Sequence, residues 1–166
     1  SHDQGQIAEH PLHGAGQGSG GTTITRRSAG NDTYAPTINC ATGSGAIELS
    51  DIAFEGNAQS GNLDAGVRLI NSCRDFRIHD AGFSKFVKSG VETRGTNSTG
   101  VVYASDFTDN FDPGSPSNGY GYGVVVYGTD SDSRPALTLG GPEAVFIEDN
   151  YFRQNRHSIA SNSNSG

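Results

Sequence analysis

The basic side chains of this 166-residue chain are concentrated in one short segment. Six of its 11 lysine and arginine residues lie between positions 68 and 94, where only three residues are acidic. They are Arg68, Arg74, Arg77, Lys85, Lys88 and Arg94. The chain as a whole has a net charge of −7, which argues against a nucleic acid partner. A local cluster of basic groups on an acidic protein attracts carboxylates, so this segment predicts a site for an anionic ligand.

A group of aspartates that follows the basic segment suggests a different chemistry. It consists of Asp106, Asp109 and Asp112. Their carboxylate oxygens are the kind of ligand that Ca²⁺ prefers, and Ca²⁺ is the one cofactor that the sequence suggests. Aspartates are also frequent where a chain turns, and this is the simpler interpretation of the group.

A repeated pattern indicates which elements position these side chains. In each copy an aliphatic residue is followed after two positions by a small or acidic residue, and after three more by phenylalanine. The copies begin at Leu49, Ile78, Val102 and Ile147, and their phenylalanines are Phe54, Phe83, Phe107 and Phe152. The phenylalanines are 29, 24 and 45 residues apart. Such spacings indicate a solenoid, propeller or array, because one unit cannot bury its apolar face alone.

Each copy continues into a second short β-type run, at residues 65–69, 89–93, 122–126 and 157–160. Strands of three to five residues with a two-residue alternation suit a parallel β-helix, in which each strand pairs with its counterpart in the next coil. From about residue 38 to the C-terminus, the chain resembles the right-handed parallel β-helix (pectate-lyase-like) superfamily. The resemblance implies an all-β, single-stranded right-handed parallel β-helix, and we expect a partial or truncated one.

The expected organisation is a single domain with two parts. Residues 1–37 form a glycine-rich N-terminal segment and the first coil. Residues 38–166 form the coils of the β-helix, with loop insertions at 111–121 and 131–143. Loops that project from a rigid scaffold are where such folds usually place function.

The repeat also predicts where side chains point. The four phenylalanines should stack inside, and Asn57, Asn110 and Asn155 fall in register as a ladder that Phe86 interrupts. With Ile78 inside, Arg77 and His79 face outward. Register then gives one external row of Ser50, His79, Tyr103 and Glu148. Arg68 and Glu92 share a second row, one coil apart, and should pair.

Polysaccharide lyases of this superfamily cleave uronate chains by β-elimination, and the resemblance implies the groups that they need. A cation neutralises the carboxylate, a base takes the adjacent proton, and an acid assists the leaving oxygen. Arg77 or Arg94 could neutralise, Lys85 or Lys88 could be the base, and His79 or Tyr103 the acid. Further substrate contacts are expected from Arg68, Glu92, Arg94 and Glu148. The alternative is that all of these are ordinary solvated side chains.

The two cysteines bear on redox state and location. Cys40 and Cys73 should occupy similar turns of neighbouring coils. Such coils are about 4.8 Å apart, which is within disulfide reach, although two buried thiols are the alternative. No stretch is apolar for long enough to span a membrane. The composition resembles that of secreted β-solenoids, so we expect a secreted or cell-surface protein.

The expected function is that of a secreted carbohydrate-active β-helix protein that binds or cleaves an extended, anionic polysaccharide. One alternative is a non-catalytic structural or adhesive rod, such as a filament or tailspike subunit, whose open coils assemble end to end. Another is a carbohydrate-binding module without catalysis. Its stacking platforms would be Tyr103, Tyr120, Tyr122 and Tyr127.

Overall fold

The computed structural model describes residues 22–25, 36–40, 46–58, 65–95, 97–114, 120–128 and 144–162. The expected insertion at 131–143, residues 115–119 of the other insertion, and most of the N-terminal segment lie outside these residues. Within the described ranges the protein is all-β, and its strands form three sheets in which every pairing is parallel.

Each sheet is built from strands that are far apart in the sequence. Sheet A contains β1 (Thr22–Thr25), β4 (Ile52–Glu55), β7 (Gly82–Ser84), β10 (Asp106–Thr108) and β13 (Tyr151–Arg153). Sheet B contains β2 (Thr37–Asn39), β5 (Ala65–Ile70), β8 (Ser89–Arg94), β11 (Tyr122–Tyr127) and β14 (His157–Asn162). Sheet C contains β3 (Ile47–Ser50), β6 (Phe76–His79), β9 (Thr99–Tyr103) and β12 (Ala144–Glu148).

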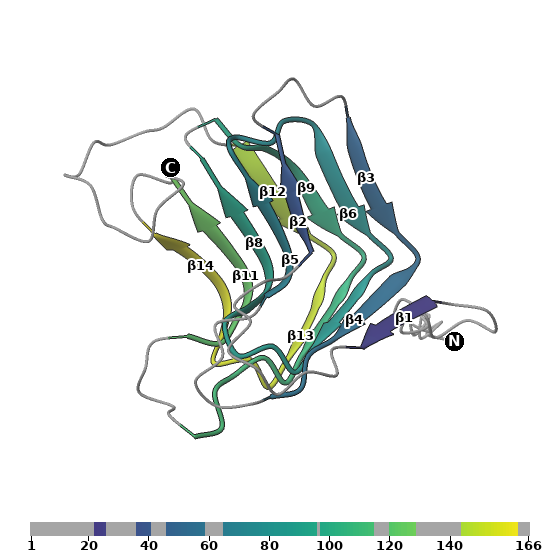
Figure 1. Cartoon of the computed structure of the whole chain (residues 1–166), viewed down its shortest axis with the longest axis vertical. Helices are drawn as coiled ribbons and strands as arrows, with labels where there is room; N and C mark the ends of the chain where they lie inside the picture. Colours follow the sequence, from purple (N-terminus) through teal and green to yellow (C-terminus); the bar gives the residue numbers. More distant parts are fainter. Residues whose placement is uncertain are drawn as a thin grey trace, which may run out of the picture.

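The chain visits the three sheets in a fixed order, C then A then B, and this order defines a coil. The strands β6, β7 and β8 form one coil, and each of them pairs with its counterpart in the coils before and after. Figure 1 shows β3, β6 and β9 side by side, with the chain turning a corner from β3 into β4. The parallel β-solenoid expected from the repeat is therefore confirmed.

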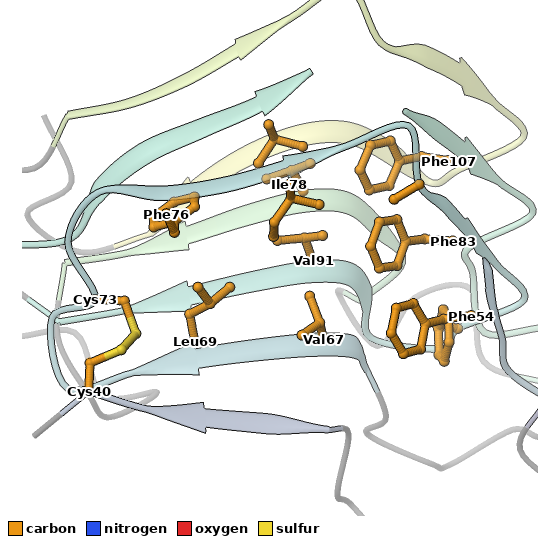
Figure 2. Close-up of a cluster of buried hydrophobic side chains, with 14 residues drawn as sticks. Cys40, Phe54, Val67, Leu69, Cys73, Phe76, Ile78, Phe83, Val91 and Phe107 are labelled. Atoms are coloured by element: carbon orange, nitrogen blue, oxygen red, sulfur yellow. A yellow bond between two sulfur atoms is a disulfide. The ribbon is translucent and has the colours of Figure 1, made fainter. Parts of the chain in front are cut away.

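The interior is organised around a stack of phenylalanine rings. Ring centroids are 5.4 Å apart for Phe54 and Phe83, and 5.1 Å apart for Phe83 and Phe107 and for Phe107 and Phe152. Figure 2 shows Phe54, Phe83 and Phe107 in line beside Val67 and Val91 of sheet B. The predicted ladder is confirmed, and the aliphatic residues of sheets B and C fill the rest of the core.

Three glycines at equivalent positions of sheet B make room for these rings. A Cβ atom would lie 2.5 Å from Cδ1 of Phe83 at Gly66, 2.7 Å from Cδ1 of Phe107 at Gly90, and 2.6 Å from Cε1 of Phe152 at Gly123. Real Cβ atoms do not approach other atoms so closely. The stacked phenylalanines therefore require a row of glycines opposite them on sheet B.

The corner between sheets C and A has a backbone conformation that favours short polar side chains. Asp51, Asp80 and Asp149 have φ angles of 53°, 47° and 51°, and Ala104 occupies the same position with 46°. Aspartate and asparagine tolerate this left-handed region better than most residues. The aspartates that precede phenylalanine in the repeat therefore lie at this bend.

The turn between sheets A and B is held by an asparagine ladder. The Asn110 side-chain amide donates to Oδ1 of Asn155 at 2.8 Å, and the Asn155 amide donates to the Phe107 carbonyl oxygen at 2.9 Å. At the position of Phe86 the backbone N–H donates instead to Oδ1 of Asn110, at 3.0 Å. The contact between Asn110 and Asn155, and the interruption of the ladder at Phe86, are as the repeat predicts.

Cys40 and Cys73 form a disulfide between neighbouring coils, with Cα atoms 5.1 Å apart (Figure 2). Cys40 follows β2, and Cys73 lies between β5 and β6. The bridge therefore fastens the start of the described sheet B to the next coil. In the described ranges, no helix has the length and hydrophobicity needed to cross a membrane.

Candidate functional site

The basic residues of positions 68 to 94 do not form one stripe. Because one coil passes over all three sheets, Arg68 and Arg94 belong to sheet B, Arg77 belongs to sheet C, and Lys85 lies in the turn between sheets A and B. The basic groups that the sequence clusters in one segment are therefore divided among different faces of the coil. Alternation within one strand is a local property, whereas the face on which a strand lies is set by the corners of the coil.

The outer row expected on sheet C is present. Strand register pairs Ser50 with His79, His79 with Tyr103, and Tyr103 with Glu148. The rings of His79 and Tyr103 are stacked, with centroids 4.8 Å apart. Arg77 lies in the adjacent outer row and is exposed, as expected.

Two carboxylates hold the His79 ring. Its Nδ1 lies 2.8 Å from Oδ2 of Asp80, and its Nε2 lies 3.0 Å from Oε1 of Glu48. Burial of the ring lowers the pKa of His79, but the hydrogen bonds and charges of Asp80 and Glu48 outweigh it, and the net shift is upward. The charged imidazolium is therefore favoured, and it has no lone pair with which to act as a base.

Sheet B carries a buried cluster of charges on its outer side. Val67, Leu69 and Val91 point into the core, so alternation turns Arg68 and Glu92 outward, and register places them side by side. The Arg68 Nε atom lies 2.9 Å from Oε1 of Glu92, which confirms the expected pair.

Two more cations contact the same carboxylate. The Lys88 Nζ atom lies 3.1 Å from Oε2 of Glu92, and the Arg94 Nε atom donates to Oε1. Glu92 is completely buried. Arg68 Nε is at ion-pair distance from Oε1 of Glu92, and Lys88 Nζ is at ion-pair distance from Oε2. Among the described residues, neither Arg68 Nε nor Glu92 Oε2 has a well-aligned hydrogen bond. Buried charges with incomplete hydrogen bonding are expensive, and such groups are concentrated at functional sites.

Tyrosine rings surround the cations of this cluster. Lys88 Nζ lies 5.8 Å from the ring centroid of Tyr120 and 5.6 Å from that of Tyr127, and the Arg94 guanidinium lies 4.7 Å from the Tyr127 ring. Lys88 is only 1% exposed and Tyr127 only 3%. The base expected at Lys88 therefore cannot meet a polymer in this arrangement, and Tyr127 is not an exposed stacking platform. Both residues stabilise the cluster instead.

Lys85, the other expected base, is exposed but poorly suited to take a proton. Its Nζ atom lies 2.5 Å from Oε1 of Glu55. The hydrogen bond and the charge of Glu55 raise the pKa of Lys85 above its ordinary value. A catalytic lysine base needs a lowered pKa, so this environment works against the role.

The three aspartates considered for Ca²⁺ are not brought together. None of the described residues forms a group of three or more side chains that could hold a metal ion. Asp109 faces Arg153 at 4.0 Å, and Asp112 is buried and accepts a hydrogen bond from the Gly114 backbone at 3.0 Å. Within the described ranges, these contacts fit turn-forming aspartates.

A group of which only Tyr122 was expected, as a stacking platform, lies where β11 and β14 begin. Tyr122 and His157 are paired in register, and their rings are stacked with centroids 5.7 Å apart. The Nη1 atom of Arg156 lies 2.8 Å from Nε2 of His157. Both Arg156 and His157 are exposed, and Tyr122 is half-buried. The sequence contained a signal for this pairing, because Tyr122 and His157 are each the first residue of the second β-type run in their copy of the repeat.

No family model matches the chain, and neither a curated protein nor a solved structure matches it. The identification of candidate residues therefore depends on the geometry of the chain itself. That geometry singles out the outer side of sheet B, where the buried cluster of Arg68, Lys88, Glu92 and Arg94 shares a sheet with the exposed group of Tyr122, Arg156 and His157.

Proposed function

We propose that this protein is a carbohydrate-binding β-solenoid of the right-handed, pectate-lyase-like kind. It binds an extended anionic polysaccharide on the outer side of sheet B. The observation that carries the proposal is the exposed stack of Tyr122 and His157 with Arg156 beside it, on the same sheet as the buried charge cluster around Glu92.

The shape of the protein supports a polymer as the ligand. Neighbouring strands of a sheet are about 4.8 Å apart, so each outer row presents side chains at regular short intervals along the stack of coils. Such rows are long and shallow, which suits an extended chain of repeating sugars better than a compact metabolite. On sheet B one such row contains Ser89, Tyr122 and His157, and another pairs Arg68 with Glu92.

Some residues of sheet B and its edge can contact the ligand, and others support the strands that carry them. Arg156, His157 and the partly exposed Arg68 can reach a ligand, and the Tyr122 ring offers a flat surface for a sugar ring. The guanidinium groups form paired hydrogen bonds with carboxylates, which favours uronic acids over neutral sugars. The buried Lys88 and its partners hold the strands beneath this surface in place.

A secreted or cell-surface location is part of the proposal. The disulfide between Cys40 and Cys73 supports it, because such bridges persist in oxidising compartments and are rare in the cytosol.

The proposal is tested by measuring the binding of polygalacturonate, alginate and chondroitin sulfate by affinity electrophoresis, with neutral dextran for comparison and with and without Ca²⁺. We expect the acidic polymers to bind and the binding to weaken as salt increases. Arg156→Ala should reduce affinity, whereas the matched change Arg153→Ala, on sheet A, should not. Equal binding of dextran, or no binding of any polymer, would refute the proposal.

Exposed apolar side chains in the first and last described coils favour a second candidate, a structural rod that assembles end to end. Ile159 belongs to the inward row of Val67, Val91 and Val124, yet it is 51% exposed. At the other end Ile24, which is in register with Phe54, is 46% exposed. An uncovered coil presents apolar side chains and unpaired strand edges that another coil can cover.

Assembly is measured directly by size-exclusion chromatography with light scattering and by electron microscopy. Ile159→Lys should shift an assembling protein to the monomer, and the outward substitution Tyr151→Lys serves as its control. A protein that is monomeric at all concentrations rules out the rod.

A further inference from the structure

The turn between β8 and β9 contains a sequence that can be modified with a sugar chain. Its residues Asn97-Ser98-Thr99 match the pattern Asn-x-Ser/Thr, in which the middle residue is not proline. The secretory pathway of eukaryotic cells attaches an oligosaccharide to the asparagine of this pattern. The chain contains one further match, Asn31-Asp32-Thr33, which lies outside the described residues.

The turn is held by its middle residue. Ser98 is completely buried, and its hydroxyl donates to the carbonyl oxygens of Arg94 and Gly95 at 3.1 and 3.2 Å. The Ser98 carbonyl oxygen in turn accepts a hydrogen bond from the Ala144 N–H, at 3.1 Å, in the next coil. None of these bonds uses the Asn97 side-chain amide, so a modification of that amide leaves them intact.

Asn97 lies at the surface, on the side of the stack of coils. It is half-buried, in contrast to the completely buried Ser98 beside it. A glycan is bulky and solvated, so the asparagine that carries it must reach solvent. Both β8 and β9 have a neighbouring strand on each side, so the turn that joins them is away from the first and last described coils.

The Asn97 position is also clear of the residues proposed to bind the polymer. Tyr122 pairs in register with Ser89 at the start of β8, whereas Asn97 follows the end of that strand at Arg94. The five steps from Ser89 to Arg94, at about 3.3 Å each, span about 16 Å. A glycan on Asn97 therefore leaves Tyr122 and its neighbours accessible.

The disulfide supports passage of the chain through the compartment in which this modification occurs. Bridges such as that between Cys40 and Cys73 form in the oxidising lumen of the secretory pathway and are rare in the cytosol. The bridged turn also contacts the modified sequence directly, because the Thr99 N–H donates to the Cys73 carbonyl oxygen at 2.9 Å.

We propose that Asn97 is a site of N-linked glycosylation in a eukaryotic secretory pathway. This inference rests on the proposed secreted location and is independent of the polymer that sheet B binds. The co-substrate is an oligosaccharide carried on a lipid diphosphate. The Asn97 Nδ2 atom bonds to the anomeric carbon of that sugar and loses one proton. The bond from this carbon to the diphosphate oxygen breaks, and the lipid diphosphate leaves with the electron pair.

The Thr99 hydroxyl determines when the transfer takes place. In the folded protein its Oγ1 atom accepts a hydrogen bond from the Asp75 backbone N–H at 3.2 Å. The transferase must recognise this hydroxyl, because the pattern requires Ser or Thr at that position. The sugar is therefore added before β9 closes against the preceding coil, and the test follows the chain as cells make it.

No other described asparagine is followed by Ser or Thr two positions later. Asn71 lies in the corresponding turn of the preceding coil, between β5 and β6. Its side-chain amide donates to Oδ1 of Asn39 at 2.6 Å, and the bridged Cys73 occupies the place of the hydroxyl residue. Asn71 is therefore the matched control for Asn97.

The test expresses the whole chain with a secretory leader in eukaryotic cells, with Asn31→Gln to remove the other match. Intact mass is measured before and after treatment with peptide N-glycosidase F, and peptide mapping locates the modified residue. We expect a glycan that the enzyme removes, leaving aspartate in place of Asn97. Asn97→Gln and Thr99→Ala should each abolish the glycan. Thr99→Ser retains the hydroxyl and should remain glycosylated.

The control Asn71→Gln should keep the glycan on Asn97, and Asn97→Gln should bind the polymer as its parent does. An unmodified Asn97 peptide in the parent, whether the chain is secreted or retained in the cell, overturns the inference and leaves the binding proposal standing. A glycan that persists in Thr99→Ala also overturns it. Failure of the glycosylated protein to bind any polymer refutes the binding proposal alone, because the peptide map does not depend on it.

Discussion

Gly90 and Phe107 are complementary in shape: a Cβ atom on Gly90 would lie 2.7 Å from Cδ1 of the Phe107 ring and 2.8 Å from the Gly123 carbonyl oxygen. The ring is stacked between Phe83 and Phe152, so it cannot move away from such an atom without disturbing its neighbours. The glycine is therefore as much a part of the core as the phenylalanine.

The substitution Gly90→Ala should destabilise the protein by about 1–3 kcal/mol, the usual cost of an extra methyl group in a filled core. Urea unfolding measures the change. Gly82→Ala is the control, because Gly82 pairs in register with Ala53, a position that already carries a methyl group. The interpretation fails if the two substitutions have equal effects.

The disulfide between Cys40 and Cys73 should appear in the intact mass, which without reductant will be two hydrogens lower than after reduction. The bridge spans 33 residues. By the loop-entropy relation, its removal in the double variant Cys40→Ala, Cys73→Ala should cost about 4 kcal/mol. Free alkylation of both thiols without reductant would contradict the bridge.

The pairing of His79 predicts a dependence of stability on pH. The pKa of His79 is raised in the folded protein, so its charged form is more favourable beside Asp80 and Glu48 than it is in water. This contribution is fully present below the unfolded-state pKa of about 6.5 and is lost as the pH rises through the higher folded-state value.

The parent protein should therefore be more stable than His79→Gln in acidic solution, and the difference should shrink as the pH rises from about 6 to 8. Urea unfolding of both proteins across this range measures it. An NMR titration of the imidazole gives the direction of the shift independently. A difference that grows with pH would show that the sign is wrong.

Glu92 is expected to be essential to the fold. Its buried carboxylate contacts Arg68, Lys88 and Arg94, and removal of its charge leaves these cations without that partner. The change Glu92→Gln should cost on the order of 3 kcal/mol, which is the usual scale for breaking a buried ion pair. The exposed Glu148→Gln serves as the matched control and should change stability by well under about 1 kcal/mol. Similar unfolding midpoints for both variants would rule out this role.

The solenoid could be predicted from spacing because its signal is local and repeated. A phenylalanine at a fixed offset from an aliphatic residue identifies equivalent positions in successive coils, and parallel pairing then places Phe83 beside Phe107 and Arg68 beside Glu92. The aspartates before phenylalanine suit the bend for a local reason too, because their conformational preference is a property of the residue itself. The glycine ladder was visible in the sequence, but its purpose depends on rings that approach from another sheet.

The sequence by itself determined which residues share a row, since register follows from the repeat and alternation follows from the strand. Only the tertiary structure decided which rows share a face and which side chains can be reached. Arg77 and Lys88 are eleven positions apart in one basic segment, yet a corner of the coil puts one on sheet C in solvent and the other beneath tyrosines on sheet B. The approach of Arg156 to His157 and the burial of Glu92 depend in the same way on contacts between coils. Periodicity along a chain specifies the direction of a side chain, but its exposure and its partners depend on what packs around it.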